Sequence, residues 1–260
     1  MSVRVPAVAG TFYPADPREL ASMVDAMLAE ARGDGAPAAL VAPHAGYVYS
    51  GPVAASAYAL LRGSDVRRVA ILGPAHYVPL RGCAVPAAES WATPLGEVPI
   101  DADLRDAVCV PVDDGPHGPE HSLEVQLPFL QRVLPEGFSV LPVAVGACAP
   151  AEVADVIGEL PADLLVVVST DLSHYHDDAT AKRRDRRTAD AVLARDPEAI
   201  GPEDACGVFA LRGLVEHARR RRLAIELLDL RTSADTAGDP RRVVGYGAFA
   251  VRRPGPRQPS

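Results

Sequence analysis

Short runs of apolar residues alternate along this chain with longer segments whose apolar positions recur every three to four residues. Runs that are apolar throughout, such as 38–42 and 164–169, are typical of strands buried on both faces. In segment 16–31, by contrast, Leu20, Val24 and Met27 fall on one face of a helix. The pattern predicts strands at 38–42, 68–72, 140–145, 164–169, 224–230 and 243–251, and helices at 16–31, 52–61, 123–133, 151–159, 179–194 and 208–221.

Strands buried on both faces need helices on both sides of the sheet. We therefore expect one layered α/β domain, residues 1–252, with a mainly parallel or mixed sheet, because no Pro/Gly/Ser-rich linker divides the chain. The last strand, 243–251, is the candidate for an antiparallel edge strand. Residues 253–260, rich in proline and arginine, are expected to form a disordered tail.

Composition narrows the class of protein. The chain has 260 residues and a formal net charge of −8, which argues against a nucleic-acid binder. The basic runs 182–187 and 219–222 are interpreted as solvated helix faces, with a ligand or partner patch as the alternative. The N-terminus has no signal-peptide pattern and no apolar run reaches about 18 residues, so we expect a cytoplasmic protein without a membrane segment.

Histidines and carboxylates collect just after the predicted strands. His44 follows strand 38–42, His76 follows 68–72, Asp171 and His174 follow 164–169, and Asp235 follows 224–230. Ligands of open α/β sheets bind beyond the carboxyl ends of the strands, where such residues converge. The sequence therefore predicts a site at that edge.

Each of these residues also has a plain structural interpretation. His44, His76 and Asp235 could be turn residues, and Asp171 could cap a helix rather than orient His174. His176 competes with His174 as the site histidine, and we favour His174 because it lies nearer the strand end. A further histidine, His121, precedes a helix and either satisfies its first turn or supports the site.

Two imidazoles and one carboxylate form a facial triad, which leaves coordination positions open and suits ferrous iron. A structural zinc site would close with four ligands, commonly cysteines. The four cysteines, Cys83, Cys109, Cys148 and Cys206, are scattered without a CxxC pair and are expected to be reduced thiols. A remaining histidine would be free to transfer protons near neutral pH.

Six segments, in order along the chain, resemble motifs of the Memo-like family, called AmmeMemoRadiSam system protein B in prokaryotes. They are AGTFYP (9–14), APHAGYVYSG (42–51), LGPAHYVPL (72–80), EHSLEVQLP (120–128), TDLSHY (170–175) and VGY (244–246). The resemblance extends from about Val5 to Val251.

The resemblance implies the fold of class III extradiol dioxygenases, with the cleft at their iron site. It makes His44 and His76 the ligand histidines and His174 the catalytic histidine. Asp235 falls at the third ligand position, where animal Memo proteins carry a cysteine. A carboxylate there makes Fe(II) the expected metal, ahead of copper, which a thiolate would favour, and of zinc.

Further residues and partners follow from the same resemblance. Phe12, Tyr49 and Asp171 match residues that line the family's cleft, and we place His121 in the substrate pocket beside Phe12. Prokaryotic members often accompany a radical-SAM protein and an AMMECR-type protein, which are the expected partners.

These expectations combine into one functional hypothesis, a metal-dependent, dioxygenase-like oxidoreductase acting on an aromatic or phenolic group. His44, His76 and Asp235 would hold the metal, His174 would move a proton, Asp171 would orient His174, and Tyr49 would supply a hydroxyl. Two alternatives stay open: a zinc-dependent hydrolase, and a non-catalytic protein that binds a peptide or partner in a vestigial cleft.

Overall fold

The computed structural model describes residues 2–33, 35 and 37–253. The strands are β1 (Val3–Arg4), β2 (Ala39–Ala42), β3 (Arg68–Pro74), β4 (Cys83–Ala84), β5 (Ser90–Thr93), β6 (Gly96–Pro99), β7 (Ser139–Val145), β8 (Leu165–Ser169), β9 (His174–His176), β10 (Ala224–Thr232) and β11 (Val243–Arg252). The α-helices are α1 (Pro17–Glu30), α2 (Tyr47–Tyr58), α3 (Ala102–Ala107), α4 (Leu127–Val133), α5 (Pro150–Glu159), α6 (Asp178–Ala194) and α7 (Val208–Arg221). Short 3-10 helices lie at Ala59–Leu61, Glu124–Gln126, Pro197–Ala199 and Ser233–Asp235.

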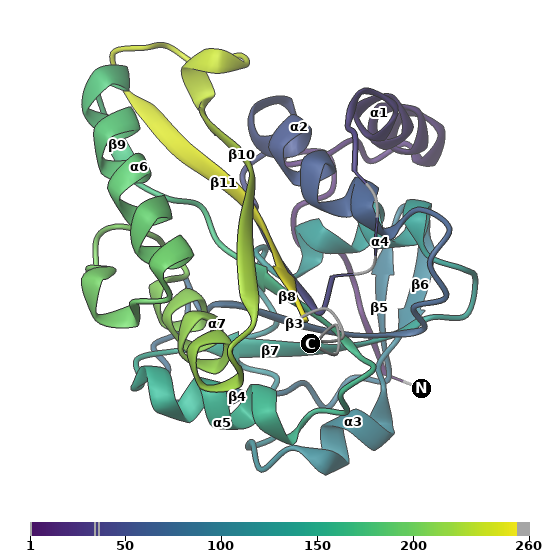
Figure 1. Ribbon diagram of the computed structural model, residues 1–260. Helices are drawn as coiled ribbons and strands as arrows, with labels where there is room; N and C mark the ends of the chain where they lie inside the picture. Colours follow the sequence, from purple (N-terminus) through teal and green to yellow (C-terminus); the bar gives the residue numbers. More distant parts are fainter. Residues whose placement is uncertain (1, 34, 36, 254–260) are drawn as a thin grey trace, which may run out of the picture.

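A mixed 8-stranded sheet forms the centre of the molecule (Figure 1), in the order β10-β11-β2-β8-β3-β7-β4, with β9 paired to β11 off this path. The four strands β2, β8, β3 and β7 are parallel neighbours. Strands β4, β10 and β11 pair antiparallel with their neighbours. A separate 3-stranded sheet has the order β1-β5-β6.

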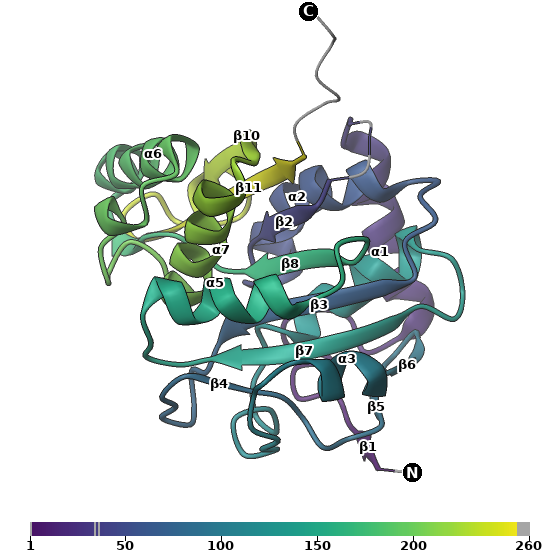
Figure 2. The same cartoon turned by 60° about the horizontal axis from the view of Figure 1, so that its bottom comes forward.

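Alternating residues of the parallel strands face two different hydrophobic cores. In β2, Leu40 packs into one core and Val41 into the other. The same alternation separates Ile71 from Leu72 in β3. Figure 2 shows the consequence, with helices on both faces of the sheet. Burial on both faces explains why these strands are apolar along their whole length.

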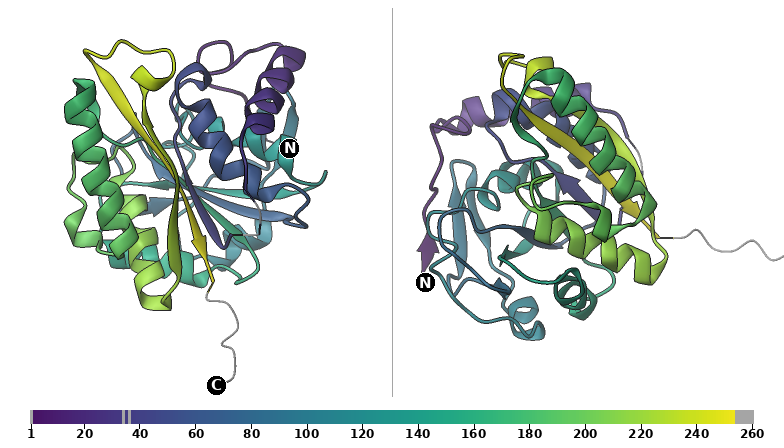
Figure 3. Two further views of the ribbon diagram at one scale, coloured as in Figure 1. Left: turned by 45° about the horizontal axis from the view of Figure 1, so that its top comes forward. Right: turned by 90° about the vertical axis from the view of Figure 1, so that its left-hand side faces the viewer.

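The helices divide between the two faces. Buried residues of α1, α2 and α4 belong to one core, and those of α5 and α7 to the other. In Figure 3, α1 and α2 lie on one side of the β10–β11 ribbon and α6 and α7 on the other. Helix α1 begins where Asp16 accepts hydrogen bonds from the N–H groups of Arg18 and Glu19, with Pro17 in the first turn.

The predicted single α/β domain with helices on both faces of a mixed sheet is confirmed, and each predicted strand and helix has a counterpart. The prediction placed Pro52 at the start of a helix, where proline is usually found. In the structure Pro52 lies inside helix α2, which begins earlier, at Tyr47. The short strands β1, β4, β5, β6 and β9 and helix α3 were not predicted, since two to six residues are too few to show a period.

The position of the last strand differs from the prediction. Strand β11 is antiparallel to β2, as expected, but β10 covers its other side and forms the sheet edge. The predicted tail 253–260 lies outside the described residues except for Arg253. Among the described residues, no helix combines the length and the hydropathy needed to cross a membrane.

Candidate metal centre

A cleft of about 520 Å³ lies at the carboxyl ends of the parallel strands. The residues His44 after β2, His76 after β3 and His174 after β8 all line it. Its lining residues are Phe12, His44, Ala45, Gly46, His76, Tyr77, His121, Asp171, His174, Tyr175, Cys206 and Val244. A cavity of about 650 Å³ between α1, α2 and β10 is larger but has no histidine or cysteine in its lining, so chemistry and not size singles out the cleft.

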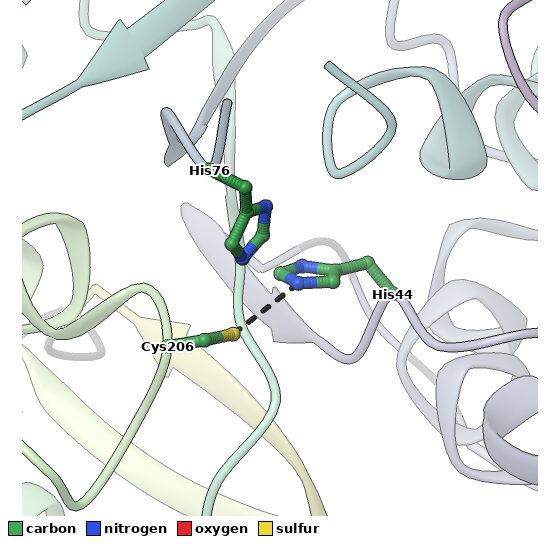
Figure 4. A group of neighbouring side chains, drawn as sticks. All are labelled: His44, His76 and Cys206. Carbon is green, nitrogen blue, oxygen red and sulfur yellow. Dashed lines mark hydrogen bonds between the residues drawn. The ribbon is translucent and has the colours of Figure 1, made fainter. Parts of the chain in front are cut away.

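Three potential metal ligands converge in this cleft. One ligand atom each from His44, His76 and Cys206 lies within 4.8 Å of the other two. The Nε2 atom of His44 is 3.2 Å from the Sγ atom of Cys206. Figure 4 shows both imidazoles and the sulfur pointing toward a common point. The separations suit one shared cation, because Zn–N and Zn–S bonds, for example, are about 2.0–2.3 Å long.

The ring of His44 is held in the tautomer that a metal ligand requires. Its Nδ1 atom is 2.9 Å from the hydroxyl of Ser169. That hydroxyl donates its only hydrogen to the carbonyl of Ser122 and accepts a hydrogen bond from Gln126 Nε2. The hydroxyl has no further hydrogen to donate, so it can only accept a second hydrogen bond, from His44 Nδ1. The imidazole proton of His44 therefore lies on Nδ1. The lone pair of His44 Nε2 is left free toward the cleft.

The ring of His76 is fixed in the same way by a carboxylate. Glu120 Oε1 lies 2.9 Å from His76 Nδ1, and Oε2 accepts the backbone N–H of His76 at 2.6 Å. Burial acts to raise the pKa of Glu120, but the hydrogen bond and charge interaction with His76 outweigh it and hold the pKa at about 2. An ionised carboxylate only accepts hydrogen bonds, so His76 also carries its proton on Nδ1. Such carboxylate–histidine pairs are typical of metal sites.

The imidazole of His44 is neutral at physiological pH. Burial and, after it, the nearby His76 together lower the pKa of His44 to about 3. His121, whose ring stacks on that of His76 with centroids 4.8 Å apart, has its pKa lowered to about 4, first by burial and then by His44. A neutral imidazole is the form that binds a metal.

The thiol of Cys206 is protonated when no cation is near. Burial is the main cause that raises the pKa of Cys206, and the carboxylate of Asp171 adds to it. The S–H group donates to the free lone pair of His44 Nε2, since Nδ1 holds the imidazole proton. A cation at this point would displace that proton, because coordination deprotonates a thiol. The donor set therefore fits a metal ion.

Asp171 and His174 lie beside the three ligands. The carboxylate of Asp171 accepts the backbone N–H of His44 at 2.7 Å, and burial raises its pKa. The Nδ1 atom of His174 lies 2.8 Å from the carbonyl of Leu172, which can only accept, so His174 Nε2 is unprotonated in the neutral ring. Ligand atoms of Asp171, His174 and Cys206 lie within 4.8 Å of one another.

Asp235 is not brought to His44 and His76. Its carboxylate forms an ion pair of 2.9 Å with Lys182 and caps the backbone N–H of Thr232 at 2.9 Å. It does not line the cleft, and no potential metal-binding group found among the described residues includes it. The expected set of His44, His76 and Asp235 is therefore not brought together, and the potential ligand that lies with the two histidines is Cys206.

Other predicted residues differ in how well the structure agrees with their expected roles. Phe12 and His121 line the cleft, and so does His174, whereas His176 does not. The side chain of Tyr49 lies outside the cleft lining and is 40% exposed. Asp171 was expected to orient His174, and the Nδ1 atom of His174 lies 2.8 Å from the carbonyl of Leu172.

Sequence reasoning missed Cys206 and the role of Glu120. Cys206 precedes helix α7 and does not follow a strand, so the strand-end argument could not find it. The signal in the sequence is Gly207, which directly follows Cys206. In the structure a Cβ at this position would lie 2.8 Å from the Ser169 carbonyl oxygen, so only glycine allows this loop to approach the end of β8. A cysteine directly before such a glycine is held against the strand end.

The fold and the cleft define an α/β protein with a two-histidine, one-cysteine candidate metal centre at the ends of its parallel strands. Residues 4–250 match the model of the Memo-like protein family. The chain is 38% identical to a MEMO1 family protein of Methanopyrus kandleri, over 96% of this chain and 99% of that protein. It is 36% identical to a MEMO1 family protein of Archaeoglobus fulgidus, over 96% of this chain and 100% of that one. This chain belongs to the Memo-like family.

Proposed function

We propose that this chain binds one redox-active metal ion through His44 Nε2, His76 Nε2 and Cys206 Sγ, and acts as a metal-dependent oxidoreductase on an aromatic or phenolic group. The observation that carries the proposal is the convergence of these three atoms within 4.8 Å. The hydrogen bonds of both imidazoles support it, because they leave both Nε2 lone pairs free.

The thiolate changes the expected metal. A carboxylate as third ligand would favour ferrous iron, whereas two imidazoles and one thiolate are the donor set of copper electron-transfer sites. We therefore propose copper beside iron, with zinc as the competitor that the same donors accept. When bound, such a metal would supply one-electron chemistry to a substrate oxygen.

The residues around the ligands support an aromatic substrate. Phe12, Tyr77 and Tyr175 line the cleft, and the last two are 56% and 64% exposed, so their rings are available for contact. The guanidinium of Arg242 lies 4.4 Å from the ring centroid of Tyr175 and adds positive charge at this rim. His174 Nε2 is the group that would accept the proton of a phenol. The extradiol resemblance favours the same substrate class.

Metal binding is the direct test. Wild-type protein, His44→Ala and Cys206→Ser would be titrated anaerobically with Cu(I) and Fe(II) in competition with a chelator of known affinity. We expect each substitution to weaken binding at least tenfold. Cys109→Ser is the matched control, because Cys109 is exposed and lies outside the cleft. If Cys206→Ser binds both metals as tightly as Cys109→Ser does, the ligand assignment is wrong.

A further variant tests the metal preference. Cys206→Asp would replace the thiolate by the carboxylate of a facial triad, so the ratio of Fe(II) to Cu(I) affinity should rise. Oxygen consumption with a catechol by the metal-loaded protein tests the reaction. No consumption with either metal would count against the oxidoreductase assignment.

A zinc-dependent hydrolase is the second candidate, because three protein ligands beside an open cleft are also the arrangement of catalytic zinc. Ester or peptide hydrolysis by zinc-loaded protein without oxygen would favour it. The exposed Tyr77 and Tyr175 also suit peptide binding. Peptide capture that is unchanged by His44→Ala would favour a non-catalytic role.

A further inference from the structure

Two cysteines outside the cleft lie on adjacent chain segments. Cys83 is in β4, which pairs antiparallel with β7 and places Cys83 opposite Val145. Beyond this pair the two segments stay together: the N–H of Gly82 donates to the carbonyl of Ala147 at 3.1 Å. Cys148 is the next residue, so both cysteines project from neighbouring backbones.

The two thiols are close enough for each to shift the pKa of the other, and the Cys148 Sγ donates a hydrogen bond to the carbonyl of Gly146 at 3.3 Å. Both residues are only partly buried, so a small reagent can reach them. The pair is distinct from Cys206, whose sulfur contacts His44, and from the exposed Cys109. Two cysteines on hydrogen-bonded neighbouring segments can form a disulfide when their side chains turn toward each other, since a disulfide joins Cβ atoms about 3.5–4.5 Å apart.

The two sulfurs are not equivalent. The interaction between the thiols lowers the pKa of Cys148 and raises the pKa of Cys83, so Cys148 ionises first. Cys148 directly precedes Ala149, the N-cap residue of α5, and the positive end of that helix stabilises a thiolate. Glu152 in the first turn of α5 opposes this effect in part.

We propose that Cys83 and Cys148 form a reversible dithiol–disulfide site that reacts with a peroxide. The Cys148 thiolate attacks one peroxide oxygen, the O–O bond breaks, and Cys148 becomes a sulfenic acid while the other oxygen leaves as hydroxide. The Cys83 sulfur then attacks the Cys148 sulfur, a disulfide forms, and the sulfenic oxygen leaves as water. In sum, two thiols and hydrogen peroxide give one disulfide and two water molecules. A small dithiol returns the pair to the reduced state by exchange.

The site would couple oxidation to the segment that carries a cleft residue. His76 and Tyr77 lie between the end of β3 and Cys83, and a disulfide would tie the end of this segment to the chain after β7. The bond would restrict opening of this segment. The oxidised protein should therefore unfold at a higher temperature than the reduced protein.

Differential alkylation tests the proposal on the wild-type protein. Fully reduced protein would be treated with hydrogen peroxide, its remaining thiols blocked, the disulfides reduced, and the newly released thiols labelled with a second reagent and located by peptide mass spectrometry. We expect the second label on Cys83 and Cys148 together and its loss after treatment with dithiothreitol before blocking. Cys109→Ser, the control, should give the same pattern.

Single variants test the order of attack. In Cys83→Ser, a sulfenic acid should persist at Cys148 and be trapped by dimedone, whereas Cys148→Ser should show at least several-fold less trapping at Cys83. Equal trapping in the two variants would overturn the assigned order. The disulfide itself is refuted if Cys83 and Cys148 of the wild-type protein stay open to the first blocking reagent under conditions that oxidise the exposed Cys109.

Discussion

Replacing Glu120 with glutamine is expected to weaken metal binding about 10- to 100-fold, or roughly 1.4–2.7 kcal/mol. The Glu120 carboxylate accepts four hydrogen bonds, from the backbone N–H and Nδ1 of His76 and from the backbone N–H groups of His121 and Ser122, at 2.6–3.0 Å. Glutamine keeps the shape of the side chain but turns one acceptor into a donor. It also removes the negative charge that increases the basicity of the His76 ring.

The orientation of the new amide follows from the same contacts. Oε1 faces three donors and Oε2 faces only the His76 backbone N–H, so the amide oxygen should keep the Oε1 position. The NH₂ group would then meet the His76 N–H, and two donors would be left without acceptors at a cost of about 1–3 kcal/mol. The backbone at His76 should shift, and its Nε2 atom would lose its alignment with His44.

Glu124→Gln is the matched control. Glu124 is also completely buried, four residues away, but it binds the N-terminal segment through Arg4, Tyr13 and the backbone of Ala7 and Val8 and does not line the cleft. Its ion pair with Arg4 is buried, so this variant should lose about 3 kcal/mol of stability while keeping its metal affinity.

Chelator competition would measure metal affinity and urea unfolding would measure stability for both variants. Only Glu120→Gln should lose affinity beyond what its loss of stability explains. If Glu120→Gln binds metal as the wild type does, or if Glu124→Gln loses the same affinity, Glu120 does not position His76 and the reasoning fails.

Two further predictions concern the fold. Gly213→Ala should lower the free energy of unfolding in urea by about 1–3 kcal/mol, because its Cβ would lie 2.3 Å from the Cβ of Val153 where α7 packs on α5. The control Gly158→Ala in α5 meets nothing within 4 Å and should raise this free energy by up to about 1 kcal/mol. Equal effects of the two substitutions would refute this packing. Burial acts to raise the pKa of Asp101, but hydrogen bonds, led by the one from Arg68, outweigh it and lower this pKa to about 2. Asp101 therefore stabilises the fold above its unfolded pKa near 4, and this stabilisation is lost as the pH falls toward 2. The stability gap between wild type and Asp101→Asn, about 2 kcal/mol near pH 6, should therefore narrow near pH 3, and a gap independent of pH would contradict the assignment.

Much of the candidate site could be predicted from the sequence because parallel strands end at one edge of a sheet. His44, His76 and His174 follow the strands β2, β3 and β8, which are direct neighbours, and all three line the cleft. Local sequence identified those strands through their unbroken apolar runs. The argument needed only that consecutive strand ends meet.

The same argument failed for Asp235 because the position of a residue after a strand carries no information on the order of the strands in the sheet. Asp235 follows β10, and β11 lies between β10 and β2, so two strand spacings of about 4.8 Å each separate its strand from that of His44. Lys182 on α6 then provides the nearer partner for its charge.

The sequence by itself determined the long strands and most of the helices, the α/β class and the histidines at the strand ends, because apolar periodicity and strand-end position are local properties. The tertiary structure alone decided which third potential ligand lies beside the two imidazoles. Cys206 is 162 positions from His44 in the chain, yet their atoms are in contact because Gly207 allows the loop before α7 to lie against the end of β8. Such a contact depends on how closely two backbones approach, and that distance is fixed only when the whole sheet and its helices have packed.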